Sequence, residues 1–229
     1  MIHCDLHIHS KHSFDSLAAP EKIVDLALAR GIQCIAIADH GNMAGSLEAQ
    51  KYVQEKHLPM IVILAEEVKS GQGDILALNI KEPIPDHLPG SEVLKRIKDQ
   101  GGFSAAAHPF GLFCGFKKNL ADYLGQFDAV EILNGSVFWG NGKAKEFAQK
   151  HGLPFTAGSD SHFANRFVGS IWLELPLEYS RTLTAADVIA TIKEKKGAAG
   201  GTPESFLSKA VDHTFRSLAK LKSLSGKRQ

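Results

Sequence analysis

Short apolar runs alternate along the chain with longer stretches that have one apolar side. Runs rich in Ile, Val and Ala predict strands that are buried on both faces, hence a mainly parallel sheet covered by helices. The longer amphipathic stretches predict those helices. We expect strands at residues 2–9, 33–39, 60–68, 75–80, 103–109, 128–134, 154–160 and 169–175, and helices at 20–30, 43–57, 91–100, 141–151, 184–196 and 203–224.

The order of these elements predicts an α/β fold. Only a turn-like GQGD segment separates the strands at 60–68 and 75–80, so we expect these two to form a local hairpin. Seven or so strand–helix units favour a closed or nearly closed barrel over an open doubly wound sheet. No GxGxxG or P-loop pattern follows a strand, which argues against a nucleotide-cofactor fold. We predict a closed or nearly closed TIM-like barrel in one domain over residues 1–229.

Composition limits the class of protein but does not indicate a function. The 229 residues include 44% hydrophobic and 22% charged residues and carry a net charge of +1, typical of a globular chain without a global attraction for nucleic acid or anionic membranes. Cys4, Cys34 and Cys114 form no CxxC pair, which favours reduced thiols. With no signal-like segment and no apolar run of ~20 residues, we expect a cytoplasmic protein that binds no membrane.

Histidines and carboxylates stand where the predicted strands end. His7 and His9 share one face of a strand, so both rings can reach one ion, and Asp160 with His162 repeats this spacing near the other end of the chain. Groups spread along the chain but gathered at strand ends are typical of a metallohydrolase on a β/α barrel. A structural zinc site would be local and rich in cysteine. The candidate ligands are His7, His9, Asp15, His40, Glu67, Asp74, His108, Asp160 and His162.

The ordered motifs DLHIHS, HSFDS, IADHG, EEV, AAHPF and GSDSH resemble the PHP family, the polymerase and histidinol phosphatase domain. The resemblance covers residues 1 to about 175. It implies a distorted (β/α)7 barrel, with the strand and helices of 169–224 packing on it, and a site of two or three metal ions that hydrolyses phosphate esters. It also implies one ion held by His7, His9, Glu67 and Asp160, a second by Glu67, Asp74 and His108, and a third by Asp15, His40 and His162.

Two positions depart from the family pattern. Asp74 stands where family members often carry histidine, and Ser16 follows Asp15 where glycine is usual. An oxygen ligand shifts preference from zinc towards manganese or iron(II), with magnesium possible. Glu66 competes with Glu67 as a ligand, but adjacent strand residues point to opposite faces, and the family's glycine-x-glutamate pattern aligns best with Glu67.

The charges of these ligands favour a phosphate substrate. Three divalent ions would exceed the four carboxylates by about two positive charges, which suits a dianionic monoester. We expect a metal-bridging hydroxide to attack phosphorus in line, with His7, His9, Asp160 and His162 as the catalytic core. Arg166 and His12 could contact the phosphate, although an exposed loop arginine is an equal reading of Arg166. The substrate would be a small phosphomonoester, a nucleotide or a short oligonucleotide, not a long nucleic acid.

Other polar residues are expected to support the ligands. Asp39 and Asp5 could orient imidazoles, and Glu131 and Asn134 would lie on the rim of the site. Five aromatic residues follow two strands and could wall a pocket, although loop packing explains them as well: Phe110, Phe113, Phe116, Phe138 and Trp139.

Two other functions remain open. An amidohydrolase-type enzyme would often use a modified lysine at a mid-barrel strand end, where we expect none. A metal-binding PHP module without turnover is the second alternative, but the ligand set is complete.

Overall fold

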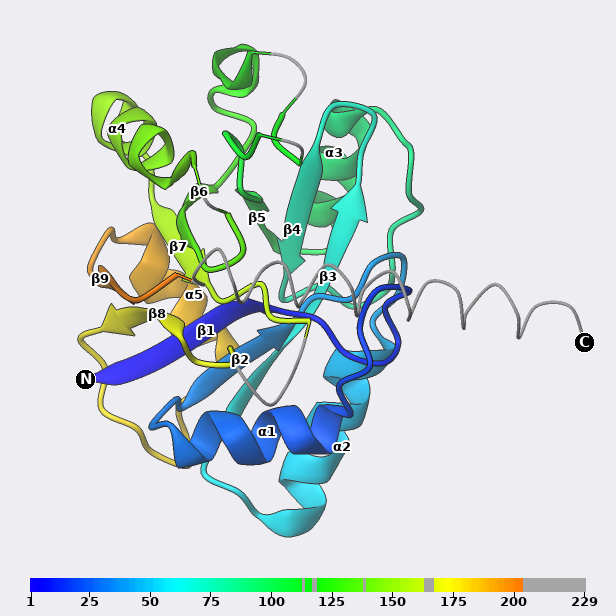
Figure 1. Ribbon diagram of the computed structural model, residues 1–229, viewed down its shortest axis with the longest axis vertical. Helices are drawn as coiled ribbons and strands as arrows, with labels where there is room; N and C mark the ends of the chain where they lie inside the picture. Colours follow the sequence, from blue (N-terminus) through cyan, green and yellow to red (C-terminus); the bar gives the residue numbers. More distant parts are fainter. Residues whose placement is uncertain (113, 117–118, 138, 163–166, 204–229) are drawn as a thin grey trace, which may run out of the picture.

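The computed structural model describes residues 1–112, 114–116, 119–137, 139–162 and 167–203 (Figure 1). Its strands are β1 (Ile2–Ile8), β2 (Cys34–Ile37), β3 (Ile61–Lys69), β4 (Asp74–Leu78), β5 (Phe103–Ala106), β6 (Ala129–Asn134), β7 (Phe155–Gly158), β8 (Ile171–Leu175) and β9 (Ala198–Gly201). Its helices are α1 (Pro20–Ala29), α2 (Ala44–Lys56), α3 (Gly90–Asp99), α4 (Asn141–His151) and α5 (Ala185–Lys193), with a 3₁₀ turn at Leu120–Tyr123.

The strands form one sheet in the order β7-β6-β5-β4-β3-β2-β1-β8-β9. β1 to β3 pair in parallel, as do β5 to β7. β4 runs antiparallel to β3 and β5, and β8 runs antiparallel to β1 and β9. The expected hairpin is therefore confirmed. The expected mainly parallel sheet is wrong, because antiparallel and parallel pairs are equally frequent among these strands.

β1 nearly closes the sheet into a barrel because its two halves have different neighbours. Residues 2–4 pair with β8. At the other end, the Asp160 N–H donates to the His7 carbonyl at 2.7 Å, and the His9 N–H donates to the Ser161 carbonyl at 2.9 Å. The segment after β7 thus pairs with the end of β1, while β8 lies beside its start. The predicted distorted barrel is confirmed.

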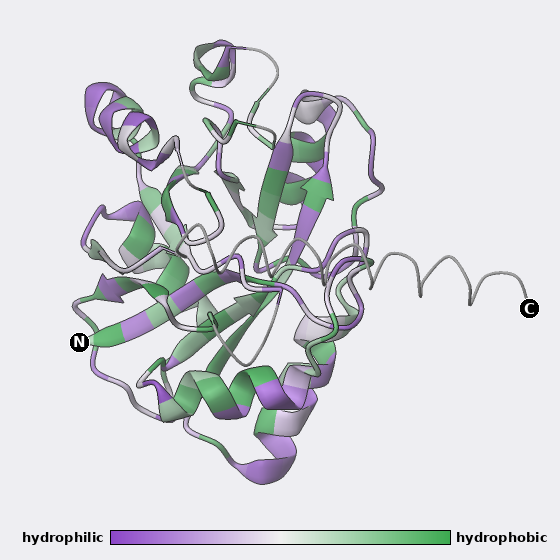
Figure 2. Ribbon diagram, in the orientation of Figure 1, coloured by the Kyte–Doolittle hydropathy of each residue, from purple (hydrophilic) through white to green (hydrophobic). Residues whose placement is uncertain are grey.

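Helices α1, α2 and α3 cover the outside of the sheet, and apolar residues run along the strands and along one side of α1 (Figures 1 and 2). Helix α5 instead shares a buried cluster with residues of β1 and β3. Ile23 of α1 and Val53 of α2 pack against Ile35 of β2 in one buried cluster. Val93 and Ile97 of α3 belong to a second cluster. Burial on both faces explains the continuous apolar strands of the sequence.

The pattern of the sequence missed one strand. β9 has the sequence AAGG, without the β-branched or aromatic residues that signal strands, and it forms through pairing with β8. The helix expected at 203–224 lies outside the described residues from 204 onward. Within the described ranges, the helices are too short or too polar to cross a membrane.

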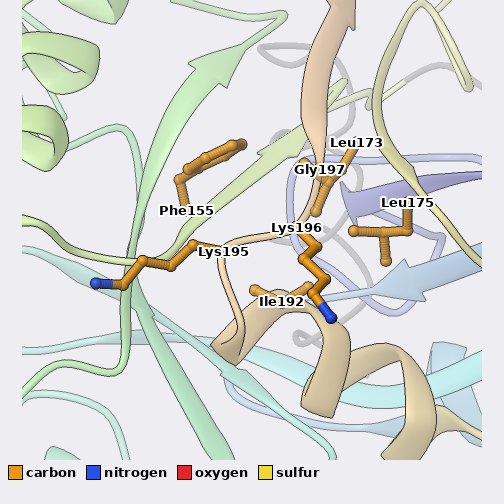
Figure 3. Close-up of a pocket in the computed structure, with 7 residues that line it drawn as sticks. All are labelled: Phe155, Leu173, Leu175, Ile192, Lys195, Lys196 and Gly197. Atoms are coloured by element: carbon orange, nitrogen blue, oxygen red, sulfur yellow. The ribbon is translucent and has the colours of Figure 1, made fainter.

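A shallow hollow of about 150 Å³ lies where β7 and β8 meet the turn between α5 and β9 (Figure 3). Leu175, in its lining, pairs with Ile2 at the start of β1, so the hollow lies at the barrel end opposite His7 and His9. The side chains that line it are aliphatic or aromatic apart from two lysines: Phe155, Leu173, Leu175, Ile192, Lys195 and Lys196, with Gly197. The residues that line this hollow therefore include no histidine and no carboxylate, unlike the residues gathered at the other end of the barrel.

Candidate metal centre

All nine predicted ligands lie in the described part of the chain and gather at one end of the barrel. His40 follows β2, and its bridge to Glu67 in β3 brings these two strand ends together. Asp74 is the first residue of β4, yet it lies at this end because β4 is antiparallel to its neighbours. Asp160 follows β7 and pairs with the end of β1. Residues from seven stretches of the chain therefore meet where the sequence predicted.

The donor atoms form five overlapping groups, and within each group three atoms lie within 4.8 Å of one another. The groups are His7–His9–Glu67, His7–His108–Asp160, His9–Asp15–His40, His9–Asp160–His162 and Glu67–Asp74–His108. Each group shares a residue with another, so the nine residues form one connected centre. The group Glu67–Asp74–His108 is the ligand set that was expected for the second ion. Asp15 and His40, expected to share the third ion with His162, form a group with His9.

Ring nitrogens and carboxylate oxygens converge at the middle of this centre. His9 Nε2 lies 3.2 Å from His7 Nε2, 3.2 Å from Glu67 Oε2 and 3.2 Å from Asp160 Oδ1. Glu67 Oε1 lies 2.9 Å from His108 Nε2, so its two oxygens face different histidines. Two imidazole nitrogens facing each other beside carboxylates form a donor set that fits a divalent cation, and Glu67 could bridge two ions.

Asp15 connects the outer part of the centre. His162 Nε2 lies 3.1 Å from Asp15 Oδ2, and His40 Nε2 lies 3.8 Å from the same oxygen. The Ser13 hydroxyl donates to the other Asp15 oxygen at 2.6 Å. Asp15, His40 and His162 thus lie together, as the resemblance implied.

The backbone of two predicted ligands is held in an unusual conformation. His108 has φ of 28° and Asp160 has φ of 50°, in the left-handed region that most residues avoid. Such conformations persist where the surrounding structure fixes them, and they are frequent at functional sites. His108 comes shortly after the end of β5, and Asp160 comes shortly after the end of β7.

Burial and proximity shift the pKa values of the centre strongly. Burial opposes the charge of His9, but hydrogen bonds and charges from Asp160 and Glu67 outweigh it and raise the pKa of His9 to about 9. Burial lowers the pKa of His40 to about 4. Burial and the neighbouring Glu67 carboxylate raise the pKa of Asp74 to about 6. Cation binding would therefore compete with a proton at His9 but not at His40.

Glu131 forms hydrogen bonds with two of the predicted ligands. Its Oε1 lies 3.0 Å from His7 Nδ1, and its Oε2 accepts the His108 N–H at 2.7 Å. Asn134 donates to the same Oε2 at 3.0 Å. Expected on the rim, Glu131 and Asn134 are instead buried, because both belong to β6 inside the barrel. Glu131 leaves His7 Nε2 directed into the centre.

Asp5 and Asp39 fix backbone around the centre. Asp5 is buried and accepts the Ser159 N–H at 2.8 Å and the Gly169 N–H at 2.7 Å, which ties β1 to the segment that carries Asp160. Asp39 accepts the N–H and the hydroxyl of Ser10, each at 2.6 Å. The hydrogen bonds described for Asp39 therefore come from Ser10, and the expectation that Asp39 orients an imidazole stays a prediction.

Three further expectations have mixed outcomes. Glu66 points away from the centre and accepts the Ile84 N–H at 2.9 Å, so Glu67 is the glutamate that faces the histidines. His12 Nε2 lies 2.5 Å from Glu48 Oε2, which engages the ring expected to reach substrate. Arg166 lies outside the described residues.

The aromatic residues expected near a pocket differ from one another. Phe110 contacts Phe147, with ring centroids 5.7 Å apart, and Phe116 packs edge-on against Phe127. Loop packing explains these two. Trp139 is 65% exposed, while the other two candidates, Phe113 and Phe138, lie outside the described residues.

Sequence reasoning missed Phe14 and Lys69. The Phe14 ring stacks on the His40 ring at 5.2 Å, and Lys69 Nζ lies 4.3 Å from the Phe14 centroid. The expectation that no lysine ends a mid-barrel strand is wrong, since β3 extends to Lys69. The available signal was the spacing of Glu67 and Lys69, which places both on one face of a strand.

Several solved structures share this fold. A two-domain protein from Bacteroides vulgatus containing a predicted PHP-like metal-dependent phosphoesterase aligns with a TM-score of 0.69 and 17% identity, over 88% of this chain and 65% of that one. PsfC from Pseudomonas syringae aligns with a TM-score of 0.68 and 16% identity, over 94% of this chain and 98% of that one. An amidohydrolase from Chromobacterium violaceum with bound sulfate and no metal aligns with a TM-score of 0.57 and 16% identity, over 87% of this chain and 92% of that one. At these identities the likeness establishes the fold alone.

Sequence relatives place the chain in a family. An uncharacterized protein of Methanocaldococcus jannaschii, MJ1587, is 34% identical over 142 residues, which are 57% of this chain and 80% of the relative. MJ0417 of the same organism, also uncharacterized, is 28% identical over 204 residues, 83% and 79% of the two chains. The PHP domain model matches residues 5–104, and the PHP-associated model matches residues 138–196. The chain belongs to the PHP domain family.

Proposed function

We propose that this protein is a metal-dependent phosphoesterase that hydrolyses a small phosphomonoester or a nucleotide. The observation that carries the proposal is the convergence of five imidazoles and four carboxylates in one centre, of which six residues are buried and three are partly buried. Such a density of ionisable groups is costly to bury unless cations compensate for it. The family and the fold support the same class of activity.

The donors suit two or three divalent ions. Glu67 would bridge two of them, since its oxygens face His108 on one side and His7 with His9 on the other. Asp15 and its neighbours would complete the outer position. When bound, the ions would supply a hydroxide nucleophile at neutral pH and neutralise charge on the phosphoryl oxygens. The mixed nitrogen and oxygen donors suit manganese, zinc or iron(II), with magnesium possible.

The chain's own residues set the charge and orientation of this centre. Three divalent ions would leave an excess of about two positive charges over the four carboxylates, which fits a phosphate dianion. Glu131 keeps His7 Nε2 pointed inward. His40, with its pKa lowered to about 4 by burial, is neutral near pH 7 and binds a cation without releasing a proton.

Amide hydrolysis is the rival function, and the amidohydrolase from Chromobacterium violaceum shares the fold. In amidohydrolases a modified lysine often holds metal ions together. Lys69 ends β3, but its ammonium group lies over Phe14 at 4.3 Å from the ring centroid. This position favours the phosphoesterase.

The test measures metal content and phosphate release together. Protein loaded with manganese should retain two or three ions and release phosphate from small monoesters or nucleotides. Asp160→Asn should lower that rate by about 10³-fold, because it removes a charged donor while its amide tolerates the left-handed backbone. Asp99→Asn, which changes an exposed partner of Lys95, is the matched control and should be silent. Bound ions without turnover of any ester would contradict the proposal, and turnover of amides would favour the rival.

A further inference from the structure

Lys69 stands at the mouth of the centre, on the same face of β3 as Glu67. The two residues are separated by one position in the strand, so their side chains leave the sheet in the same direction. Across the hairpin, Lys69 is paired in register with Asp74 of β4. Its ammonium therefore projects beside the predicted ligands rather than towards the outer helices.

The Lys69 ammonium rests on an aromatic ring and has no carboxylate partner. Nζ lies 4.3 Å from the centroid of Phe14, whose ring stacks on His40. Among the described residues, no carboxylate oxygen lies within 4.0 Å of this nitrogen. Asp86, the nearby acid, uses Oδ1 to accept the Lys69 backbone N–H at 2.8 Å. The half-buried side chain thus carries a positive charge without a direct ion pair, and the carboxyl of Asp74 interacts with this charge only from a greater distance.

The neighbouring cation at this end of the barrel is already engaged. Lys11 Nζ lies 2.6 Å from Glu48, and His12 lies 2.5 Å from the other oxygen of the same carboxylate. Lys69 differs because a cation–π contact, which is weaker than an ion pair with a charged oxygen, is what holds it. An incoming anion could therefore recruit Lys69 without first displacing a carboxylate.

We propose that Lys69 binds an anionic oxygen of the substrate at the mouth of the centre and so sets substrate affinity. The inference rests on the proposed phosphoesterase function. The oxygen belongs either to the phosphoryl group itself or to a second anionic group beside it on the substrate. Phe14 positions the ammonium for this contact, which limits the side-chain entropy lost on binding. Lys69 anchors the substrate and does not hold metal ions.

The experiment uses manganese-loaded protein and inorganic phosphate as the probe. If Lys69 binds the phosphoryl group, Lys69→Met should raise the Kd for phosphate, measured by calorimetry, by about tenfold, because a charge-assisted hydrogen bond is lost. For any ester that the wild type cleaves, KM should rise similarly while kcat stays within about twofold. Lys69→Arg should restore most of the affinity. Lys81→Met, at an exposed lysine beyond the far end of β4, is the control and should change nothing.

Two competitors locate the oxygen. Glycerol 3-phosphate has one anionic group, whereas 3-phosphoglycerate adds a carboxylate. Equal weakening of both by Lys69→Met assigns Lys69 to the phosphoryl group, and weakening of 3-phosphoglycerate alone assigns it to the second anion. Unchanged affinity for phosphate and both competitors would overturn the inference while leaving wild-type ester cleavage, and so the proposed function, intact.

A loss of bound manganese in Lys69→Met would also overturn the inference, because it would make Lys69 part of the metal set. If the loaded wild type neither binds phosphate nor cleaves an ester, the proposed function itself fails. These outcomes are distinguishable because metal content, phosphate binding and turnover are measured separately on each variant.

Discussion

β1 carries a histidine–glutamate pair near each end, and the two pairs have opposite surroundings. His3 Nε2 lies 3.1 Å from Glu174 Oε2, and these side chains are 35% and 38% exposed. His7 Nδ1 lies 3.0 Å from Glu131 Oε1, and both side chains are fully buried. Solvent screens the first pair, so it contributes little to stability. The second is shielded from water, and loss of either partner would leave a buried polar group unsatisfied.

The difference shows how one strand serves two purposes. Around residues 2–4, β1 is covered by β8 and its inward side chains belong to an aliphatic cluster. Past residue 6, the same strand presents His7 to a buried carboxylate, and His9, directly after the strand, faces another. The aliphatic end stabilises the barrel through burial. The other end orders charged groups whose burial opposes folding, and the fixed frame of the barrel makes that arrangement possible.

The largest expected effect comes from substituting glycines, one packed beside each end of β1. A Cβ on Gly158 would lie 2.4 Å from His7 Cβ and 2.6 Å from the His7 backbone nitrogen. At the far end, a Cβ on Gly200 would lie 2.9 Å from Trp172 Nε1, a side-chain atom. Gly158→Ala should lower the free energy of unfolding by about 3 kcal/mol, because backbone must move.

Gly200→Ala is the matched variant, and it should cost less than about 1 kcal/mol, since the indole can shift. Urea denaturation of both proteins measures the difference, and elemental analysis should find fewer ions bound to Gly158→Ala. Equal destabilisation by the two substitutions would contradict the view that the metal end is the more tightly constrained.

Features of the fold and site that follow from local sequence patterns could be predicted, whereas those that depend on contacts between distant parts of the chain could not. The apolar runs predicted the barrel and, because strand ends meet at one edge, the gathering of the nine ligands. The choice of Glu67 over Glu66 followed from strand alternation. The partners of Asp39 and Glu131 were not predictable, because they depend on which strands become neighbours and at what depth.

Two omissions have local causes. β9 lacked a signal because its four residues are alanine and glycine, so it forms only by pairing with β8. Lys69 was missed because β3 was expected to end at residue 68, one position early. The proximity of Lys69 to Phe14 adds a contact between segments 55 positions apart in the sequence, which no local pattern encodes.

A second expected effect concerns pH. In chelated protein, burial opposes the charge of His9, but Asp160 and Glu67 raise its pKa to about 9, and carboxylates raise the pKa of His7 as well. A histidine with a raised pKa stabilises the fold fully below the unfolded value of about 6.5, and that contribution is lost as pH rises through about 9. The free energy of unfolding should therefore fall by about 2 kcal/mol from pH 6.5 to 9, part of the gain being shared among coupled groups.

Urea denaturation in excess chelator at a series of pH values measures this slope. His9→Gln should flatten it, because the amide does not titrate. Saturating manganese should reverse it, since a cation requires the neutral ring and binds better as pH rises. Stability that increased between pH 6.5 and 9 in chelated protein would contradict the assignment of charged histidines to the ion-free centre.

The smallest expected effect compares the two glutamates directly. Glu131→Gln keeps the shape of the side chain but removes the charge that orients His7, and its amide nitrogen must meet either the His7 ring or the His108 N–H. Manganese affinity should fall by about tenfold, the lower range for loss of a group that orients a metal-bound histidine. Glu174→Gln should leave metal affinity unchanged and alter stability by less than about 0.5 kcal/mol.

Titration of each chelated variant with manganese separates orientation from folding. If Glu131 acts by orienting His7, activity in Glu131→Gln returns when manganese is raised in proportion to the weakened affinity, and the unfolding transition of the loaded protein stays close to that of the wild type. If Glu131 served only to fill the space beneath β1, the substitution would spare metal affinity, because glutamine has nearly the same volume. Loss of affinity in Glu174→Gln would remove the contrast between the two ends of β1, because a screened surface carboxylate has no contact through which to reach the metal centre.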